Sequence, residues 1–281
     1  MIQQTSITGE QFSQSSLQTY LDCKQAYKLR YIDQLTWPSI QVDPQLENEK
    51  QQAEGIFFHK LIHQYLLGIP QASIDSQVLN NPSSNIKDWW TNFIFAINSN
   101  MLDLSNYSQK FPEILLTQSF ERSKLVAKYD LIAVREDKIH IFDWKTNTKK
   151  PDHLAFEQKI QTILYMEVLA GSGFANRFIK NFQLSDIQMT YWFSNFPNQS
   201  IIFSYGEDKH RAAIAEISSL IREIEADTLY PKTDNFRRCA GCVYRSYCSR
   251  GIKAGFEADL TEEEWNDQYP AFEEDDLSSD F

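Results

Sequence analysis

Alternating apolar and polar residues between Lys128 and Pro151 predict a β-hairpin. Two runs rich in β-branched residues, Asp130–Val134 and Ile139–Asp143, flank the charged turn Arg135-Glu136-Asp137-Lys138. Pairing about this turn sets Val134 opposite Ile139, Ile132 opposite Ile141 and Asp130 opposite Asp143. The register is the same for a two-residue and a four-residue loop.

The remaining apolar patterns predict helices and strands around this hairpin. Helices are expected over residues 12–31, 46–67, 86–97, 153–170 and 207–226, and strands over 113–121, 187–193 and 200–205. Loop signals divide residues 68–112, which we interpret as a helical insertion that covers the site, with an aromatic-rich stretch over 86–107. This order of elements predicts an α/β fold, with a central mixed β-sheet flanked by helices.

The hairpin brings candidate chemistry to one face. Side chains alternate along a strand, so Asp130, Asp143 and Lys145 share a face, and the two carboxylates lie directly across the strand pair. Like charges at that distance repel each other, and a hard divalent cation with oxygen ligands would relieve the repulsion. Lys145 would then position water or stabilise charge that develops on a phosphate. The alternative is a surface hairpin whose strand ends carry Asp.

Two histidines lie on one face of the helix predicted over 46–67. His59 and His63 are four residues apart, but Lys60 stands where the helical zinc motif H-E-x-x-H has its Glu. We therefore expect one histidine to face a metal and the other to pack or face solvent. A purely structural role for both is the alternative.

The net charge limits the kinds of partner that the chain can bind. The chain of 281 residues has a formal charge of −11, and the stretch from Gly255 onward holds eleven acidic residues and no Lys or Arg, which leaves residues 1–254 neutral. A neutral body favours a local basic groove over a wrapped duplex. The acidic tail, residues 256–281, is expected to be flexible and to dock a protein partner through its scattered aromatic residues.

The compartment follows from targeting signals and cysteine use. The first residues show no signal-peptide pattern, and no apolar run is long enough to span a membrane, so a cytoplasmic protein is expected. In that compartment, four cysteines indicate a metal or a cluster rather than two disulfides.

The cysteines have a one-plus-three arrangement. Cys239, Cys242 and Cys248 lie together in the segment 236–251, with C-x2-C-x5-C spacing, and Cys23 lies far upstream. One four-thiolate site would use every cysteine and would tie the first helix to the C-terminal segment. Zinc and an iron–sulphur cluster both accept four thiolates, and free buried cysteines are the bland alternative.

Taken together, these motifs resemble those of the PD-(D/E)XK nuclease superfamily. They are most similar to its RecB-like iron–sulphur branch, which includes the CRISPR-associated exonucleases. The matching motifs are F-S-x-S-x-L-x-x-Y-L-x-C at 12–23, Gly55-x-x-x-His59, Asp130, Asp143-Trp-Lys145, Gln161-x-x-x-Tyr165 and the four cysteines. The resemblance covers Phe12 to Gly251, and all the motifs occur in the family's order.

The resemblance implies a role for each matching residue. His59, Asp130, Asp143 and the backbone carbonyl of Trp144 would bind one or two Mg²⁺ or Mn²⁺ ions. Lys145 would assist the attack of water on a phosphodiester, and Gln161 and Tyr165 would support the site or contact DNA. Cys23, Cys239, Cys242 and Cys248 would hold a 4Fe-4S cluster. The nuclease domain would cover residues 1–255, and a single strand threaded over aromatic side chains would suit the stretch 86–107.

The sequence therefore predicts a metal-dependent DNA nuclease that acts on single strands or DNA ends, in DNA repair, recombination or CRISPR adaptation. A partner-directed processing enzyme, recruited through the acidic tail, is a second interpretation on the same fold. The non-enzyme alternative is a catalytically inactive, cluster- or zinc-stapled DNA-binding module.

Overall fold

The computed structural model describes residues 10–35, 47–135, 137–147, 149–240 and 242–251. The chain divides into two compact units: Met1–Leu17 with Phe58–Asp227, and Gln18–Phe57 with Thr228–Phe281. The acidic tail that the sequence singles out lies outside the described residues, and the single nuclease domain over 1–255 stays a prediction.

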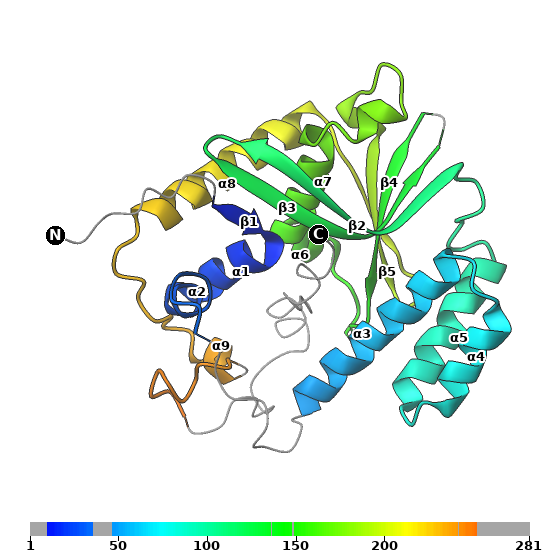
Figure 1. Ribbon diagram of the computed structural model, residues 1–281, viewed down its shortest axis with the longest axis horizontal. Helices are drawn as coiled ribbons and strands as arrows, with labels where there is room; N and C mark the ends of the chain where they lie inside the picture. Colours follow the sequence, from blue (N-terminus) through cyan, green and yellow to red (C-terminus); the bar gives the residue numbers. More distant parts are fainter. Residues whose placement is uncertain (1–9, 36–46, 136, 148, 241, 252–281) are drawn as a thin grey trace, which may run out of the picture. The chain divides into compact units, whose positions relative to one another are not determined.

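A mixed β-sheet forms the centre of the first unit (Figure 1). In the described residues it has six strands: β1 (Gln11–Ser13), β2 (Gln109–Phe120), β3 (Ser123–Val134), β4 (Ile139–Lys145), β5 (Ile187–Phe193) and β6 (Ile201–Ser204). The pairs β1–β3 and β4–β5 are parallel, and β2–β3, β3–β4 and β5–β6 are antiparallel. The predicted mixed sheet is confirmed.

One edge of β3 is shared by two strands. Strand β2 pairs along the whole of β3 on one edge. On the other edge β1 pairs with residues 124–126, and β4 pairs with residues 131–134. Residues 127–130 therefore lie in a gap between two strand partners, and Asp130 is at its end. This gap leaves room beside Asp130 for groups other than backbone.

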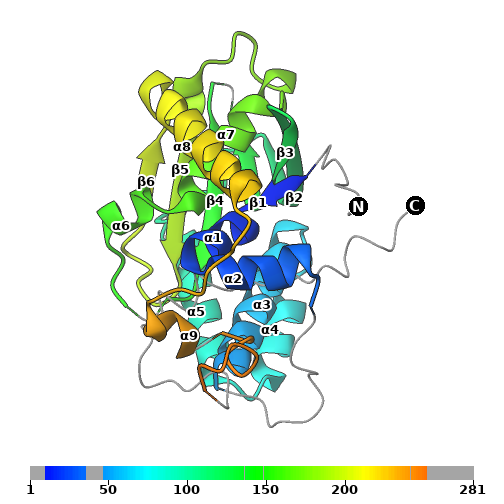
Figure 2. The ribbon, with the colours of Figure 1, turned by 90° about the vertical axis from the view of Figure 1, so that its left-hand side faces the viewer.

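The two units also contain helices. Their bounds are α1 (Gln14–Asp22), α2 (Lys24–Tyr27), the π-helix η1 (Lys28–Ile32), α3 (Glu47–Leu66), α4 (Gln71–Asn80), α5 (Ser84–Asn98), α6 (His153–Glu157), α7 (Ile160–Gly171), the 3₁₀ turns η2 (Ala175–Arg177) and η3 (Leu184–Asp186), α8 (Glu207–Ala226) and α9 (Phe236–Ala240). Helix α7 packs on β2, β3 and β5, and α8 lies against α7 (Figure 2). No helix in these ranges is long and apolar enough to cross a lipid bilayer.

The helical insertion contributes to the core, and this corrects one expectation. Helix α5 buries Trp89, Trp90 and Phe93, and the Phe93 ring lies 6.0 Å from Trp144 and 5.8 Å from Trp192. These aromatic side chains pack against the side of the sheet that carries the Trp144 and Trp192 rings, because their burial removes large apolar surfaces from water. They are therefore not a platform for a threaded single strand.

Two predicted helices are interrupted. The helix expected over 12–31 begins as strand β1, because Phe12 pairs with Leu125, and it breaks again at Cys23, whose backbone is extended. The helix expected over 153–170 breaks before α7, where Lys159 is extended and the Thr162 hydroxyl donates to the carbonyl of Phe156 at 2.6 Å. In both places a side-chain or strand contact replaces helical hydrogen bonds.

The second unit joins the N-terminal helices to the C-terminal segment, as the sequence predicts. The backbone N–H of Gln25 donates to the carbonyl of Pro231 at 3.2 Å. The hydroxyl of Tyr244 donates to the carbonyl of Leu35 at 2.9 Å. Asp22 forms an ion pair with Arg238. These contacts connect residues more than 200 positions apart in the chain.

Candidate active site

The β3–β4 hairpin has the register that the sequence predicts. Ile132 pairs with Ile141 and Val134 with Ile139. The ladder ends at Leu131, one residue short of the aspartate pair, and there the Asp130 side chain replaces a strand partner: its Oδ2 accepts a hydrogen bond from the backbone N–H of Trp144 at 2.8 Å. The first aspartate is thus fixed to the strand that carries the second.

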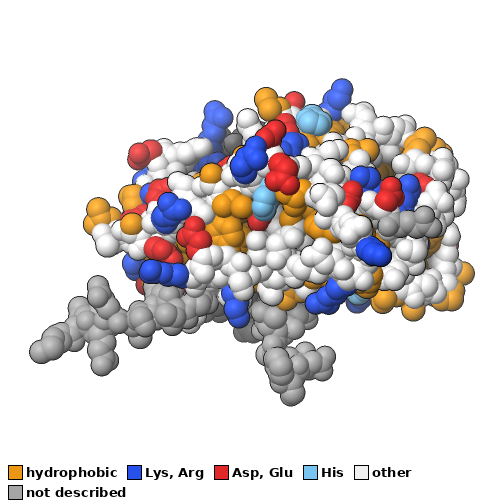
Figure 3. Space-filling model, turned by 90° about the horizontal axis from the view of Figure 1, so that it is seen from above, with side chains coloured by type: hydrophobic (Ala, Val, Ile, Leu, Met, Phe, Trp, Pro, Cys, Tyr) orange, Lys and Arg blue, Asp and Glu red, His pale blue; other side chains and the backbone are white. Residues whose placement is uncertain are grey.

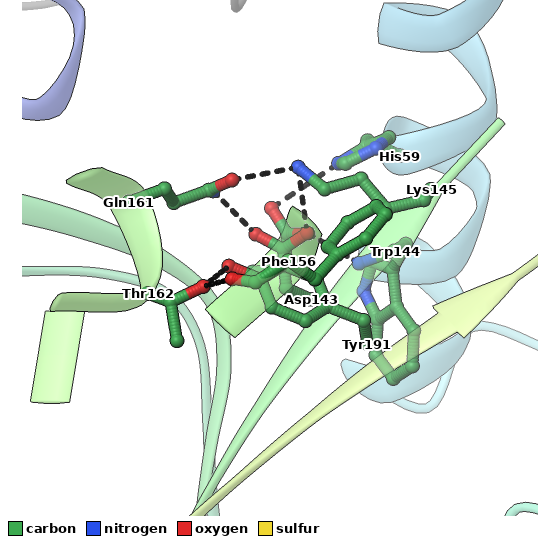
Figure 4. Close-up of polar contacts among 9 residues, drawn as sticks. His59, Asp143, Trp144, Lys145, Phe156, Gln161, Thr162 and Tyr191 are labelled. Atoms are coloured by element: carbon green, nitrogen blue, oxygen red, sulfur yellow. Dashed lines mark hydrogen bonds and ion pairs between the residues drawn. The ribbon is translucent and has the colours of Figure 1, made fainter. Parts of the chain in front are cut away.

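Asp143, Lys145 and Gln161 form a closed triangle (Figure 4). The Lys145 Nζ lies 3.0 Å from Asp143 Oδ2 and donates to Gln161 Oε1 at 2.9 Å. The Gln161 Nε2 donates to Asp143 Oδ1 at 2.8 Å. Gln161 reaches this position because the break before α7 puts it in the first turn of that helix. The lysine is therefore held in one orientation by two neighbours.

Asp130 lies at the centre of a second group. His59 Nδ1 is 3.2 Å from Asp130 Oδ1. His59, Glu113 and Asp130 each offer a ligand atom, and these three atoms lie within 4.8 Å of one another. One imidazole and two carboxylates are a donor set that suits a divalent cation such as Mn²⁺ or Mg²⁺. A metal site at His59 and Asp130 is what the sequence predicts, and Glu113 is an addition.

Glu113 escaped the sequence analysis, which began the strand at this residue and assigned it no role. In the structure β2 starts four residues earlier, and the β2–β3 register sets Glu113 opposite Asp130, where the strand ladder is interrupted. Glu113 has a φ of +53°, an uncommon conformation for a residue with a side chain. Its carboxylate is 3.1 Å from Lys128. The position of Glu113 could have been predicted only from the register between β2 and β3, and the sequence did not reveal where β2 starts.

The site contains opposed electrostatic effects. Burial acts to lower the pKa of His59, but the carboxylates of Asp130, Asp143 and Glu113 together outweigh it, and the pKa rises to about 9. Burial raises the pKa of Asp143 to about 6, with Asp130 adding to the effect and Lys145 opposing it. Burial also favours the protonated form of Asp130, but His59, the Trp144 N–H and Lys145 hold its pKa below the ordinary value. Without a cation, a proton on His59 balances the carboxylates.

The other predicted residues support the site from the core. The Trp144 indole is buried, with 2% exposed, so Trp144 contributes its backbone to the site and its ring to the aromatic core. Tyr165 is also buried: its ring lies 4.9 Å from that of Tyr129, whose hydroxyl donates to the Tyr165 carbonyl at 2.8 Å. Burial, followed by the charges of Asp143 and Asp130, raises the pKa of Tyr165 well above its ordinary value. Tyr165 therefore remains a neutral phenol.

Asn195 fixes the chain that follows Lys145. Its Nδ2 donates to the carbonyls of Thr146 at 3.0 Å and Asn147 at 2.9 Å. Its Oδ1 accepts from the indole N–H of Trp89, in α5, at 3.0 Å. Asn195, in the loop after β5, thus joins the residues that follow β4 to the helical insertion and restrains the backbone next to Lys145.

The sequence model of the PD-(D/E)XK nuclease superfamily matches residues 11–249, which include every group of this site. The chain belongs to the PD-(D/E)XK nuclease superfamily. No curated protein matches the sequence. Among solved structures, the chain is similar to the crystal structure of SSO0001, with 12% identity, a TM-score of 0.40, and coverage of 87% of this chain and 88% of the other. It is also similar to a proposed exonuclease from Eubacterium rectale, with 10% identity, a TM-score of 0.49, and coverage of 97% and 94%.

This PD-(D/E)XK nuclease also brings its four cysteines to one place, in the second unit. Cys23, Cys239, Cys242 and Cys248 line a common pocket, and none of them forms a disulfide. Their sulfur atoms do not form a tight cluster: in the described ranges, only His59, Glu113 and Asp130 place three ligand atoms within 4.8 Å. The four cysteines thus line one pocket, but among the described residues they form no cluster, and the predicted metal clasp stays a prediction.

Glu113→Gln should weaken Mn²⁺ binding by about 10- to 100-fold, because it removes one of the two carboxylates nearest His59 while keeping the side-chain shape. Calorimetric titration of Mn²⁺ into metal-free protein measures the affinity. Glu121→Gln is the matched control, since Glu121 is exposed and pairs with Arg222. Equal affinities in the two variants would remove Glu113 from the metal site.

Metal affinity should rise with pH by about tenfold per unit from pH 6 towards 9, because His59 must lose its proton to bind the cation. Below about pH 6, protonation of Asp143 should weaken binding further, so both effects have the same sign. Mn²⁺ titrations at several pH values measure the slope. In His59→Asn the slope above pH 6 should flatten, and an unchanged slope would show that another group releases the proton.

Proposed function

We propose that this PD-(D/E)XK protein is a metal-dependent deoxyribonuclease that hydrolyses phosphodiester bonds in single strands or at DNA ends. The observation that carries the proposal is the adjacency of two groups that meet at the β3–β4 hairpin: the His59–Glu113–Asp130 donors and the Asp143–Lys145–Gln161 triangle. Structural packing alone does not require a lysine held between a carboxylate and an amide beside three further ionisable groups.

The residues divide the chemical work. His59, Glu113, Asp130 and Asp143 would hold Mg²⁺ or Mn²⁺, which supplies positive charge to the phosphate and acidifies water. Lys145 places an ammonium beside the reacting phosphate, where it stabilises negative charge in the transition state. Gln161 and Asp143 keep that ammonium in place before the substrate arrives, so little reorganisation is needed during the reaction.

Charge distribution supports a local contact with DNA. Residues 1–254 have no net charge, and on the face seen in Figure 3 basic, acidic and apolar side chains are interspersed. Such a surface lacks the strong positive field that wraps a duplex, and it suits a short stretch of strand held near the cation. This pattern is the basis for proposing single strands or ends as the substrate.

We further propose that the four cysteines hold a 4Fe-4S cluster. Their common pocket is also lined by four basic side chains, which suit an anionic group. A single zinc ion with Zn–S bonds of about 2.3 Å would need sulfur atoms about 3.8 Å apart, and no three of these sulfur atoms come within 4.8 Å of one another. What supports the cluster is the one-plus-three arrangement of the four thiols together with the basic lining of their pocket.

The test is cleavage by anaerobically purified protein. Labelled single-stranded and duplex DNA are incubated with Mg²⁺, Mn²⁺ or a chelator, and iron, sulphide and zinc are measured in the same preparation. We expect cleavage that needs the divalent cation and a preparation with iron and sulphide. DNA binding without cleavage in either metal would replace the nuclease with a DNA-binding module, and zinc without iron would overturn the cluster.

A further inference from the structure

The pocket that holds the four cysteines has an unusual basic lining. Lys232, Arg238, Arg245 and Arg250 all contribute to it. Three of them have a polar contact at the pocket: Arg238 pairs with Asp22, Lys232 donates to the carbonyl of Cys248 at 2.8 Å, and Arg245 donates through Nε to the carbonyl of Arg250 at 2.9 Å. These contacts hold the pocket walls together.

Arg250 differs from the other three. Its Nη1 is buried and has no hydrogen-bond partner among the described residues. Its guanidinium carbon lies 3.9 Å from the centroid of the Phe236 ring, and its backbone carbonyl accepts the bond from Arg245. The side chain is therefore fixed by stacking while one of its charged donors lacks an acceptor.

A buried, unpaired N–H of a cation is destabilising, so it indicates a missing acceptor. Stacking on Phe236 does not explain why Nη1 is buried without an acceptor. That ring is 64% exposed and would hold a guanidinium equally well in water. The acceptor must fit a pocket lined by four thiols. A thiolate or sulphide sulfur is the acceptor that such a pocket would supply once a metal group is bound.

We propose that Arg250 donates a hydrogen bond from Nη1 to the thiolate-bound group in this pocket and thereby determines how tightly the group is held. The part of the inference that concerns the potential rests on the proposed iron–sulphur cluster, whose reduction potential the same contact raises. The reduced cluster carries one more negative charge, and a nearby cation with an N–H donor stabilises it. Arg250 is thus a positioning and tuning residue, not a ligand.

The experiment compares Arg250→Gln with wild type after anaerobic reconstitution. Iron, sulphide and zinc are counted, loss of the group to a chelator is followed by absorbance, and the midpoint potential is measured by spectroelectrochemistry. We expect Arg250→Gln to lose the group about 10- to 100-fold faster and to have a lower potential. Arg250→Lys, which keeps the charge, should recover part of both. Arg237→Gln is the control, since Arg237 is exposed on α9.

Each result decides the proposal. Equal retention and potential in Arg250→Gln and wild type would overturn it, as would a wild-type protein with no metal on its cysteines. If the pocket holds zinc, only the rate at which a chelator removes the metal tests the proposal. Circular dichroism checks folding, and Arg250→Lys replaces Arg250→Gln if the latter does not fold. DNA cleavage is assayed separately, so failure here leaves the nuclease proposal to its own test.

Discussion

Lys145→Met should lower the rate of DNA cleavage by at least about 10²- to 10³-fold, the usual cost of removing one group that stabilises transition-state charge. Methionine keeps most of the apolar stem but removes the ammonium that lies between Asp143 and Gln161. Single-turnover cleavage of labelled DNA with saturating Mn²⁺ measures the effect. The DNA should still bind, because one ammonium is a small part of the contact.

The matched control for this prediction is Lys149→Met. Lys149 follows the same strand by four residues and is exposed, so the variant has the same loss of charge away from the triangle. It should cleave within about twofold of wild type, since exposed charges contribute little. If both lysine variants lost activity equally, the effect would come from general electrostatics, and Lys145 would have no role in the reaction.

Phe93→Ala should destabilise the protein by about 3–5 kcal/mol, the range measured when a buried aromatic side chain is truncated. Phe93 is fully buried and contacts both Trp144 and Trp192, so its removal leaves a cavity behind the strand that carries Asp143 and Lys145. Urea unfolding followed by tryptophan fluorescence gives the difference in free energy of unfolding.

Phe95→Ala provides the comparison, because Phe95 lies two residues further along the same helix and is 50% exposed. Surface substitutions of this kind usually change stability by less than about 0.5 kcal/mol. A similar loss for both variants would mean that helix α5 is stabilised by its own sequence, and that the aromatic packing against the sheet contributes little.

Local sequence patterns were sufficient to predict the β3–β4 hairpin. Alternation of side chains and a short charged turn fix the pairing of Ile132 with Ile141, and this pairing sets Asp130 beside β4. Helix α8 was likewise predictable, because its apolar positions recur at helical spacing. In these segments, local preference and tertiary packing favour the same conformation.

Longer-range contacts decided the rest of the site. Glu113 approaches Asp130 only through the β2–β3 register, and Asn195 reaches the end of β4 through side-chain hydrogen bonds to residues nearly fifty positions earlier. Neither residue belongs to a pattern that repeats along the chain. The breaks at Cys23 and Lys159 lie beside two further contacts of this kind: the Gln25 N–H donates to the Pro231 carbonyl, and the Thr162 hydroxyl donates to the Phe156 carbonyl.

The sequence by itself determined the family of this protein, the mixed α/β fold, and the facing aspartates with their lysine. These features depend on residue type and short spacing, which a single chain displays directly. The tertiary structure alone decided that Glu113 lies beside His59 and Asp130, that Trp89, Trp90 and Phe93 of α5 belong to the core, and that Arg250, which lines the cysteine pocket, has a buried N–H. Those outcomes depend on how distant segments share the limited space around the sheet and the pocket, and sequence spacing does not encode that distance.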